Sequence, residues 1–265
     1  MYILLEPGRL NTMSEHSRAR ADNEIVHGRA LAVSDTEFIW GWGTPAGRLR
    51  ATRRADLIAK GAGLRPGAVA LEIGCGTGMF TQIFARSGAR ILAVDISPDL
   101  LQKARARDLS SSDVTFLEKR FEDCDSLGPF DAIIGSSILH HLEVREALSK
   151  IYNLLKPGGV ISFAEPNMMN PQIFLERKFR KFFPHISPDE TAFIRWELRK
   201  TLIGAGFSSI DVRPFDFLHP AIPPPFIGIA TAIGRVIERT AALKEFAGSL
   251  YIYGKKPERT GVTQG

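Results

Sequence analysis

The sequence predicts an α/β fold: a doubly wound, mostly parallel sheet of seven strands with helices on both faces. Strand-like and helix-like segments alternate from Gly67 onward, which is typical of parallel sheets. An apolar strand at 69–73 also runs directly into a glycine-rich loop, where such sheets bind ligands. The chain has 265 residues, of which 44% are hydrophobic and 24% charged, so it can bury a core of ordinary size.

Seven short apolar runs are the predicted strands. They lie at 69–73, 91–94, 114–117, 132–135, 160–164, 210–212 and 250–253. Helix-like segments separate most of the first five, and the last run is expected to be antiparallel. Before the first strand, residues 1–22 are polar without periodicity and are expected to lack regular structure. Residues 43–63 predict a helix, because Pro45 suits a first turn and glycines follow its apolar face.

Two segments interrupt the alternation. Residues 167–188 mix basic and aromatic side chains, and Ser187–Glu190 resembles a capping box that opens a helix ending near 204–206. Residues 218–248 begin with a proline-rich turn and continue as an amphipathic helix. The predicted apolar face of that helix consists of Phe226, Ala230, Ile233, Ile237 and Ala241.

Composition excludes several classes of protein. Two cysteines are too few for a disulfide scaffold or a four-cysteine zinc site, and we expect reduced thiols in a cytoplasmic protein. The N-terminal apolar stretch is too short for a signal peptide. Residues 217–234 carry no formal charge, but four prolines interrupt them, so we expect no membrane span. A net charge of +5 permits anionic partners without requiring them.

The first strand–helix turn carries the most informative motif. Glycines 74, 76 and 78 leave the backbone open to close approach by a ligand. Asp95 ends the next strand, where a carboxylate can accept hydrogen bonds from ribose hydroxyls. The glycine spacing fits neither the dinucleotide fingerprint nor the phosphate-binding loop of nucleotide triphosphatases. What fits is E-x-G-x-G-x-G over 72–78.

With this motif the chain resembles the class I S-adenosylmethionine-dependent methyltransferases. Three further segments in the right order resemble that family: the residues after Asp95, the strand and loop at 130–142, and the Lys-Pro-Gly-Gly turn at 156–159. The resemblance covers about 45–215 and 249–256. It implies an N-terminal lid (1–44), a catalytic domain (45–256) and a flexible tail (257–265). The insertions at 167–188 and 218–248 would form a cap over the acceptor.

The resemblance also implies a set of cofactor-binding residues for S-adenosylmethionine. Gly74 and Gly76 would line its methionine portion, Glu72 would orient the loop, and Asp95 would hold the ribose. The remaining implied residues are Cys75 and Gly78 in the loop, Ile96 and Phe121 beside the adenine, and Ser136 near the sulfonium. Many members of the family have Asp where this chain has Arg120, which departs from the usual contact to the adenine amine.

Three side chains are candidates for catalysis. An oxygen nucleophile is often assisted by a base that titrates near neutrality, and His140 and His141 follow the fourth strand on the ligand side. The phase of the loop favours His141. Glu165 ends the fifth strand and could act as a base, bind an acceptor group or stabilise a cation in C-methylation. No cluster of residues suggests a metal site.

The acceptor is expected to be a small, apolar metabolite, with O-methylation as the default reaction. Trp40 and Trp42 could line its site, and Asn167 is a weaker candidate. The alternatives are C-methylation of an alkene or enol, methylation of a nucleic acid, and binding of S-adenosylmethionine without catalysis. Basic clusters at 48–54 and 177–181 are the argument for nucleic acid, which we consider unlikely. The helix at 226–246 could contact a membrane surface peripherally.

Overall fold

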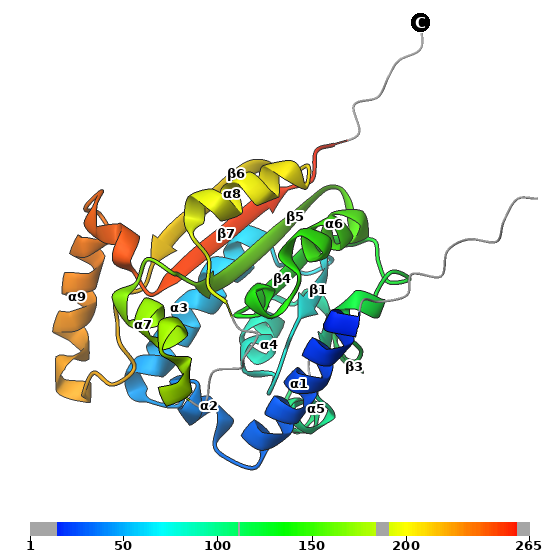
Figure 1. Cartoon of the computed structure of the whole chain (residues 1–265). Coiled ribbons are helices and arrows are strands. Elements are labelled where there is room, and N and C mark those ends of the chain that lie inside the picture. The colour runs from blue at the N-terminus through cyan, green and yellow to red at the C-terminus, as the bar shows by residue number, and fades with distance from the viewer. Residues whose placement is uncertain (1–14, 111, 184–190, 259–265) are drawn as a thin grey trace, which may run out of the picture.

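The computed structural model describes residues 15–110, 112–183 and 191–258. Its centre is one seven-stranded sheet in the order β3-β2-β1-β4-β5-β7-β6 (Figure 1). All neighbouring strands are parallel except β7, which runs antiparallel to both β5 and β6. The predicted fold class and the antiparallel last strand are therefore confirmed.

Each predicted strand is present, most of them one to five residues longer than expected. The bounds are β1 Val69–Ile73, β2 Arg90–Asp95, β3 Val114–Glu118, β4 Phe130–Ser136, β5 Leu155–Pro166, β6 Ser208–Phe215 and β7 Ser249–Lys255. The order reverses between β1 and β4, because β2 and β3 lie on one side of β1 and the later strands on the other. A ligand site is expected beyond the carboxyl ends of these two strands.

Helices cover both faces of the sheet. The bounds are α3 Pro45–Ala62, α4 Met79–Phe84 and α5 Pro98–Arg105 for one face, and α6 Val144–Leu154 and α8 Arg195–Gly204 for the other. Helix α3 begins where predicted, because the Thr44 side chain accepts a hydrogen bond from the Gly47 N–H at 2.9 Å and Pro45 occupies the first turn. It ends at Gly63, whose φ of 61° suits a glycine.

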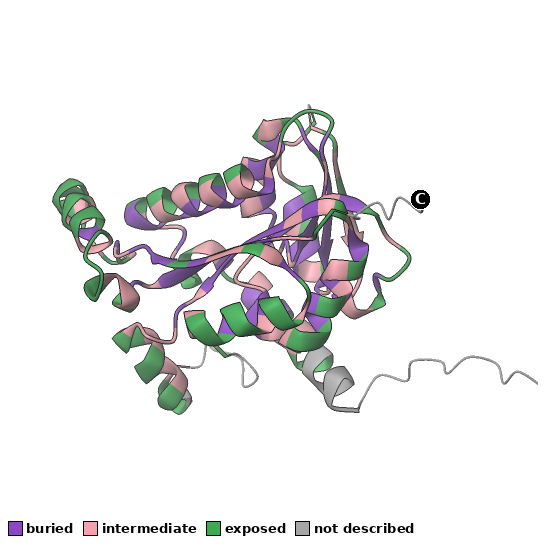
Figure 2. Ribbon diagram, turned by 90° about the horizontal axis from the view of Figure 1, so that it is seen from above, coloured by how far each residue is buried: buried purple, intermediate pink, exposed green. Residues whose placement is uncertain are grey.

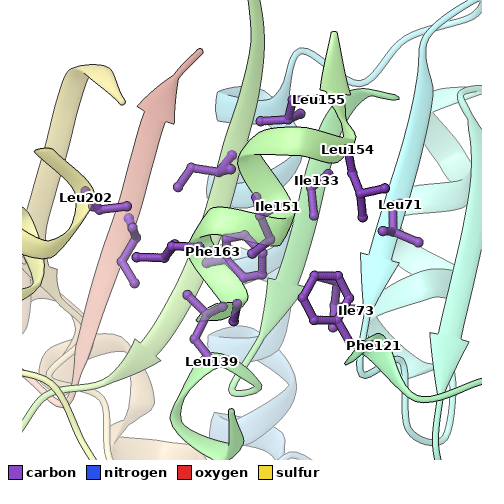
Figure 3. Close-up of a cluster of buried hydrophobic side chains, with 14 of the residues drawn as sticks. Leu71, Ile73, Phe121, Ile133, Leu139, Ile151, Leu154, Leu155, Phe163 and Leu202 are labelled. Carbon is purple, nitrogen blue, oxygen red and sulfur yellow. The ribbon is translucent and has the colours of Figure 1, made fainter. Parts of the chain in front are cut away.

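The two faces bury separate apolar clusters. Strand residues alternate between them: Leu71 and Ile133 point toward α6 and α8, while Ala70 and Ala132 point toward α3. Figure 3 shows the first cluster, in which Phe163 lies between side chains of the strands and α6. The largely buried strands at the centre of Figure 2 hold the carboxyl ends of β1, β2 and β4 in fixed positions.

Four further helices lie outside these layers. They are α1 Glu15–Ala32, α2 Thr36–Ile39, α7 Pro171–Lys178 and α9 Ile227–Ile237. Helix α1 corrects the expectation for residues 15–22, which are helical, whereas residues 1–14 lie outside the described residues. Its polar sequence gives no apolar period, and its contacts with α5 stabilise it instead. No helix among the described residues is long and apolar enough to cross a membrane.

Two predicted helices also differ in detail. Helix α8 begins at Arg195, and the predicted capping box at 187–190 lies outside the described residues. Helix α9 is shorter than predicted and is followed by a 3-10 turn, η6, at Leu243–Phe246. Its packed side is centred on Gly234, which approaches Phe217, whereas Phe226 and Ile233 of the predicted apolar face are exposed.

Candidate active site

A cavity of about 360 Å³ lies beyond the carboxyl ends of β1, β2 and β4. Its wall combines the glycine loop, the end of β2, the loop after β4, and side chains from α1, from the segment after α2 and from α7. The sequence-predicted residues on this wall are Trp40, Trp42, Gly74, Cys75, Gly76, Asp95, Ile96, Phe121, Ser136, His140 and His141. The predicted residues absent from the wall are Glu72, Gly78, Glu165 and Asn167.

The glycine loop has the conformation that its sequence requires. Gly74, Gly76 and Gly78 have φ values of 66°, 52° and 74°, in the left-handed region that other residues rarely adopt. A Cβ on Gly74 would also lie 2.5 Å from the side chain of Ile138. Gly78 does not reach the cavity; it caps α4 and packs against Ala104, so its role is structural.

Asp95 orders this loop. Its carboxylate accepts hydrogen bonds from the Gly76 N–H at 2.6 Å and the Ser97 N–H at 2.9 Å. Burial raises the pKa of Asp95, while the backbone N–H groups partly offset that effect. The side chain thus joins the loop after β1 to the loop after β2 and still borders the cavity.

Glu72 lies behind the loop rather than on the cavity wall. The side chain is buried, and burial raises the pKa of Glu72 to about 8, with a smaller opposing effect from the Thr81 hydroxyl. One carboxylate oxygen has no hydrogen-bond partner among the described residues. The Glu72 side chain does not border the cavity, so it does not contact a ligand there directly. It can influence a bound ligand only through the glycine loop or a bridging water.

Glu165 and His140 form a buried pair. The Glu165 carboxylate accepts from the backbone N–H groups of Ile138 and Leu139, each at 2.9 Å, and lies 2.6 Å from Nδ1 of His140. Burial opposes ionisation of Glu165, but the hydrogen bond and charge of His140 with the backbone donors lower the pKa of Glu165 overall. An ionised Glu165 accepts a hydrogen bond from the Nδ1–H group of His140, so it favours the tautomer in which Nε2 lacks the proton.

His141 is held from a different direction. Its Nδ1 lies 3.1 Å from the Glu24 carboxylate of α1. The rings of His140 and His141 are 4.2 Å apart between centroids, and both border the cavity. The phase of the loop alone favours His141 as the histidine that faces the site. The short 3-10 turn at Leu139–His141 brings both there.

The segment before α3 covers the glycine loop. Trp40 lies over Gly76, and Trp42 packs edge-to-face on Phe80 at 5.5 Å. Glu37 of α2 accepts from the Thr77 hydroxyl at 3.0 Å and forms an ion pair with Arg107. Side chains from the first 44 residues therefore close one side of the cavity.

Arg54 was not predicted as a site residue. This guanidinium is buried on α3 and donates to the hydroxyls of Ser136 and Ser137 at 3.2 and 3.0 Å, to Ser249 at 2.5 Å and to the Ala164 carbonyl. Burial lowers the pKa of Arg54 to about 10, and no ion pair is found for it within the described part of the chain. The signal in the sequence was the arginine cluster at 48–54, of which Arg50 and Arg53 pair with Asp216 and Glu238.

The cap side of the cavity contains Glu176 and Arg177 of α7. Asn167 does not reach it. Its Nδ2 donates to the carbonyls of Glu245 and Ala247, and its Oδ1 accepts from the Met169 N–H at 3.2 Å. Asn167 thus fixes the turn before α7 and holds η6 in place, which is structural turn chemistry.

Neither cysteine forms a disulfide, and both are buried. Burial raises the pKa of the Cys75 thiol well above its usual range, so Cys75 is an uncharged wall of the cavity rather than a nucleophile. Among the residues that the structure describes, no group of three or more histidine, cysteine, aspartate or glutamate side chains could hold a metal ion.

Comparison with known proteins identifies the class. A family profile for a methyltransferase domain matches residues 71–161, which span the glycine loop, Asp95 and the two histidines. The chain carries a methyltransferase domain and has the class I S-adenosylmethionine-dependent methyltransferase fold, as the resemblance predicted. The matched residues contain β2, β3 and β4 and parts of β1 and β5, so the match covers the strands whose carboxyl ends border the cavity.

Relatives agree with this class. The chain is 36% identical over 118 residues to a ubiquinone biosynthesis O-methyltransferase of Xanthomonas campestris, covering 43% of this chain and 49% of the relative. It thus spans about half the length of the curated relatives it matches. The N-methyltransferase NodS of Bradyrhizobium japonicum superposes with a TM-score of 0.61 at 18% identity, over 89% of this chain and all of NodS. The [4+2]-cyclase SpnF has the same fold, with a TM-score of 0.56 at 22% identity over 78% of this chain and 81% of SpnF.

Proposed function

We propose that the protein transfers a methyl group from S-adenosylmethionine to a hydroxyl of a small, apolar metabolite. The observation that carries the proposal is the cavity at the β1–β4 switch point, which brings the glycine loop, Asp95 and a carboxylate-fixed histidine to one wall. The relatives named as O-methyltransferases support the choice of oxygen as the methylated atom.

The chain's own groups fit the cofactor. Asp95 borders the cavity, where its carboxylate would accept hydrogen bonds from the ribose hydroxyls, and Ile96 and Phe121 would form apolar walls beside the adenine. Arg54 lies directly behind Ser136 and Ser137 with no carboxylate bonded to it among the described residues. Because a buried cation is costly without a counter-charge, we assign Arg54 and these serines to the carboxylate of the cofactor's amino-acid portion.

His140 is the proposed general base. The cofactor supplies a methyl group already activated by its sulfonium, so the protein must align the acceptor, exclude water and remove one proton. As the new C–O bond forms and the S–C bond breaks, the acceptor hydroxyl gives its proton to Nε2 of His140. Glu165 stabilises the resulting imidazolium without touching the acceptor, and is therefore a positioning residue. This differs from the sequence-based ranking, which favoured His141.

The acceptor side supports an apolar substrate. Trp40 and Trp42 provide aromatic walls, and the segments up to residue 44 act as the proposed lid. Helix α7 and the 218–248 insertion form the proposed cap. A peripheral contact of residues 226–246 with a membrane, in a protein of the cytoplasm, belongs to this proposal because an apolar acceptor partitions into lipid.

Two alternative reactions, C-methylation and methylation of a nucleic acid, have less support from the contacts in the structure. C-methylation requires Glu165 to act on the substrate, but its carboxylate is already engaged by two N–H groups and His140. Nucleic-acid methylation loses part of its argument, because Arg50 and Arg53 of the 48–54 cluster are occupied by internal ion pairs. SpnF, a cyclase of the same fold, shows that the fold alone does not decide the reaction.

Calorimetric titration with S-adenosylhomocysteine tests the proposal directly. We expect binding of this product and no comparable binding of NAD or ATP. Asp95→Ala should abolish it, whereas Asp113→Ala, an exposed carboxylate at the start of β3, should not. Binding followed by label transfer from S-adenosylmethionine to a lipid-soluble acceptor would support the full proposal. Preference for NAD would overturn it, and tight product binding without transfer to any extract would favour a non-catalytic binding protein.

A further inference from the structure

Helix α9 exposes a continuous apolar stripe. Phe226, Ile229, Ile233 and Val236 follow one another at spacings of three and four residues and are each more than half exposed. Figure 2 shows this helix at the left end of the molecule, covered largely by exposed residues. None of its side chains belongs to either buried cluster among the described residues. The stripe is therefore an apolar surface without an internal partner there.

Contacts on the opposite side of α9 fix the orientation of the helix. The exposure of the stripe therefore follows from specific packing of α9 against the rest of the chain. Arg53 of α3 donates to both carboxylate oxygens of Glu238 at 2.7 and 2.5 Å. Glu238 also accepts from the Asp216 N–H at 2.8 Å. Gly234 approaches Phe217 so closely that a Cβ would lie 3.2 Å from its side chain.

The charge around the stripe is positive. Arg235, on the exposed half of α9, and Arg239, in the turn directly after α9, are both exposed. The two acidic residues of the insertion are already neutralised, Glu238 by Arg53 and Glu245 by Arg195 at 2.6 Å. Apolar side chains beside unneutralised arginines match a surface that is apolar inside and anionic outside.

Helix α7 carries a second exposed apolar surface. This helix and the turn after it expose Phe174, Leu175, Phe179 and Phe182, with Lys178 lying over two of these rings at 5.7 Å. The Asn170 side chain, which caps α7, donates to the Phe246 carbonyl at 2.8 Å and thus joins α7 to η6, the turn that follows α9 in the chain. Helices α7 and α9 lie at the same end of the molecule in Figure 1, but Figure 2 shows them apart from each other there, so the two surfaces are separate.

We propose that the stripe of α9 docks on an anionic lipid bilayer. A second copy of this chain is a poorer occupant, because a two-fold interface would place the same arginines opposite each other. Helix α9 belongs to the 218–248 insertion of the proposed cap, so docking brings that cap to the lipid. The inference deepens the peripheral membrane contact of the proposed function and rests on it in that respect, but vesicle binding is measured separately from cofactor binding.

Cosedimentation of the full chain with lipid vesicles tests the docking surface. Vesicles of equal parts phosphatidylcholine and phosphatidylglycerol should sediment the protein, and phosphatidylcholine alone should do so much less. The double variant Ile229→Asp/Ile233→Asp should abolish the binding. Arg235→Gln/Arg239→Gln should weaken it about 25-fold, since each surface arginine contributes roughly fivefold.

Matched controls lie elsewhere on the surface. Ile203→Asp replaces an equally exposed isoleucine of α8, and Arg86→Gln/Arg145→Gln removes two exposed arginines outside the insertions. Neither should change vesicle binding. Three results would each overturn the proposal. The α9 variants could bind vesicles as well as the native chain does, or the native chain could fail to bind anionic vesicles. The native chain could also form a dimer in solution that the isoleucine variant dissociates. Product binding by calorimetry should be unchanged in all these variants, which separates this test from that of the proposed function.

Discussion

The substitution Glu165→Gln tests how the buried pair works. Glutamine has the shape of glutamate, and its carbonyl oxygen can still accept from the Ile138 and Leu139 N–H groups. Its amide nitrogen then faces Nδ1 of His140 and donates to it. The imidazole must therefore place its own proton on Nε2, the nitrogen proposed to accept the proton of the acceptor.

The expected cost follows from this change of tautomer. A positioned general base contributes about 100- to 10,000-fold to the rate, and Glu165→Gln should remove most of it. His140→Asn should lower kcat by a similar factor, and the double variant should be little worse than either single one, because both changes remove one device. His141→Asn should cost less than His140→Asn. Product binding should stay within a few-fold, since Glu165 does not reach the cavity wall.

Two assays check this reasoning. Single-turnover transfer from labelled S-adenosylmethionine to the acceptor found by screening gives the rate and its pH dependence. NMR of the imidazole nitrogens reports the tautomer of His140 without any acceptor. A much larger rate loss in Glu165→Gln than in His140→Asn would refute the positioning role and favour direct action of Glu165, as in C-methylation. An unchanged His140 tautomer in Glu165→Gln would refute it too.

Three further predictions concern the cofactor side. Burial raises the pKa of the Glu72 carboxyl from 4.5 in the unfolded chain to about 8 in the folded one, so the folded state binds more protons between these pH values. The free energy of unfolding should therefore fall as pH rises from 4.5 to 8, by roughly 5 kcal/mol at most. Urea unfolding at pH 5 and at pH 8 should show this decrease in the native chain and a smaller one in Glu72→Gln. An unchanged pH dependence in Glu72→Gln would contradict this reasoning. Arg54→Met should weaken S-adenosylhomocysteine at least tenfold in calorimetry. It should spare methylthioadenosine, which lacks the carboxylate, and equal weakening of both ligands would argue for a structural role. Glu37→Gln should speed dissociation of S-adenosylhomocysteine in stopped flow about fivefold by breaking a partly exposed ion pair. The control Asp113→Asn breaks an exposed ion pair with Arg90. The same acceleration in that variant would show that the Glu37–Arg107 ion pair does not specifically slow dissociation of the ligand.

Most of the sheet could be predicted because its signals are local. A buried strand such as Val69–Ile73 is a short apolar run, and the glycines after it are required by left-handed backbone angles at their own positions. The elements that were mispredicted lack such signals. Helix α1 has a polar sequence, and its stability comes from packing on α5, which no local pattern records.

The candidate site divides in the same way. Asp95 was predicted from its place after β2, since the end of a parallel strand fixes which edge of the sheet a side chain reaches. The role of Glu165 was not predicted, although its position was, because a strand-end carboxylate can face the cavity or turn back to the backbone. The donors that decide between these, Ile138 and Leu139, are 26 or more residues away in the chain.

The sequence by itself determined the order of strands and helices, the glycine loop and the class of protein, since each depends on residues close together in the chain. Only the tertiary structure decided that His140 pairs with Glu165, that Arg54 is buried behind Ser136, and that α9 turns its apolar stripe outward. The physical reason is that burial and hydrogen-bond partners are properties of the packed chain. A buried charge or an exposed isoleucine has the same letter in the sequence as its ordinary counterpart.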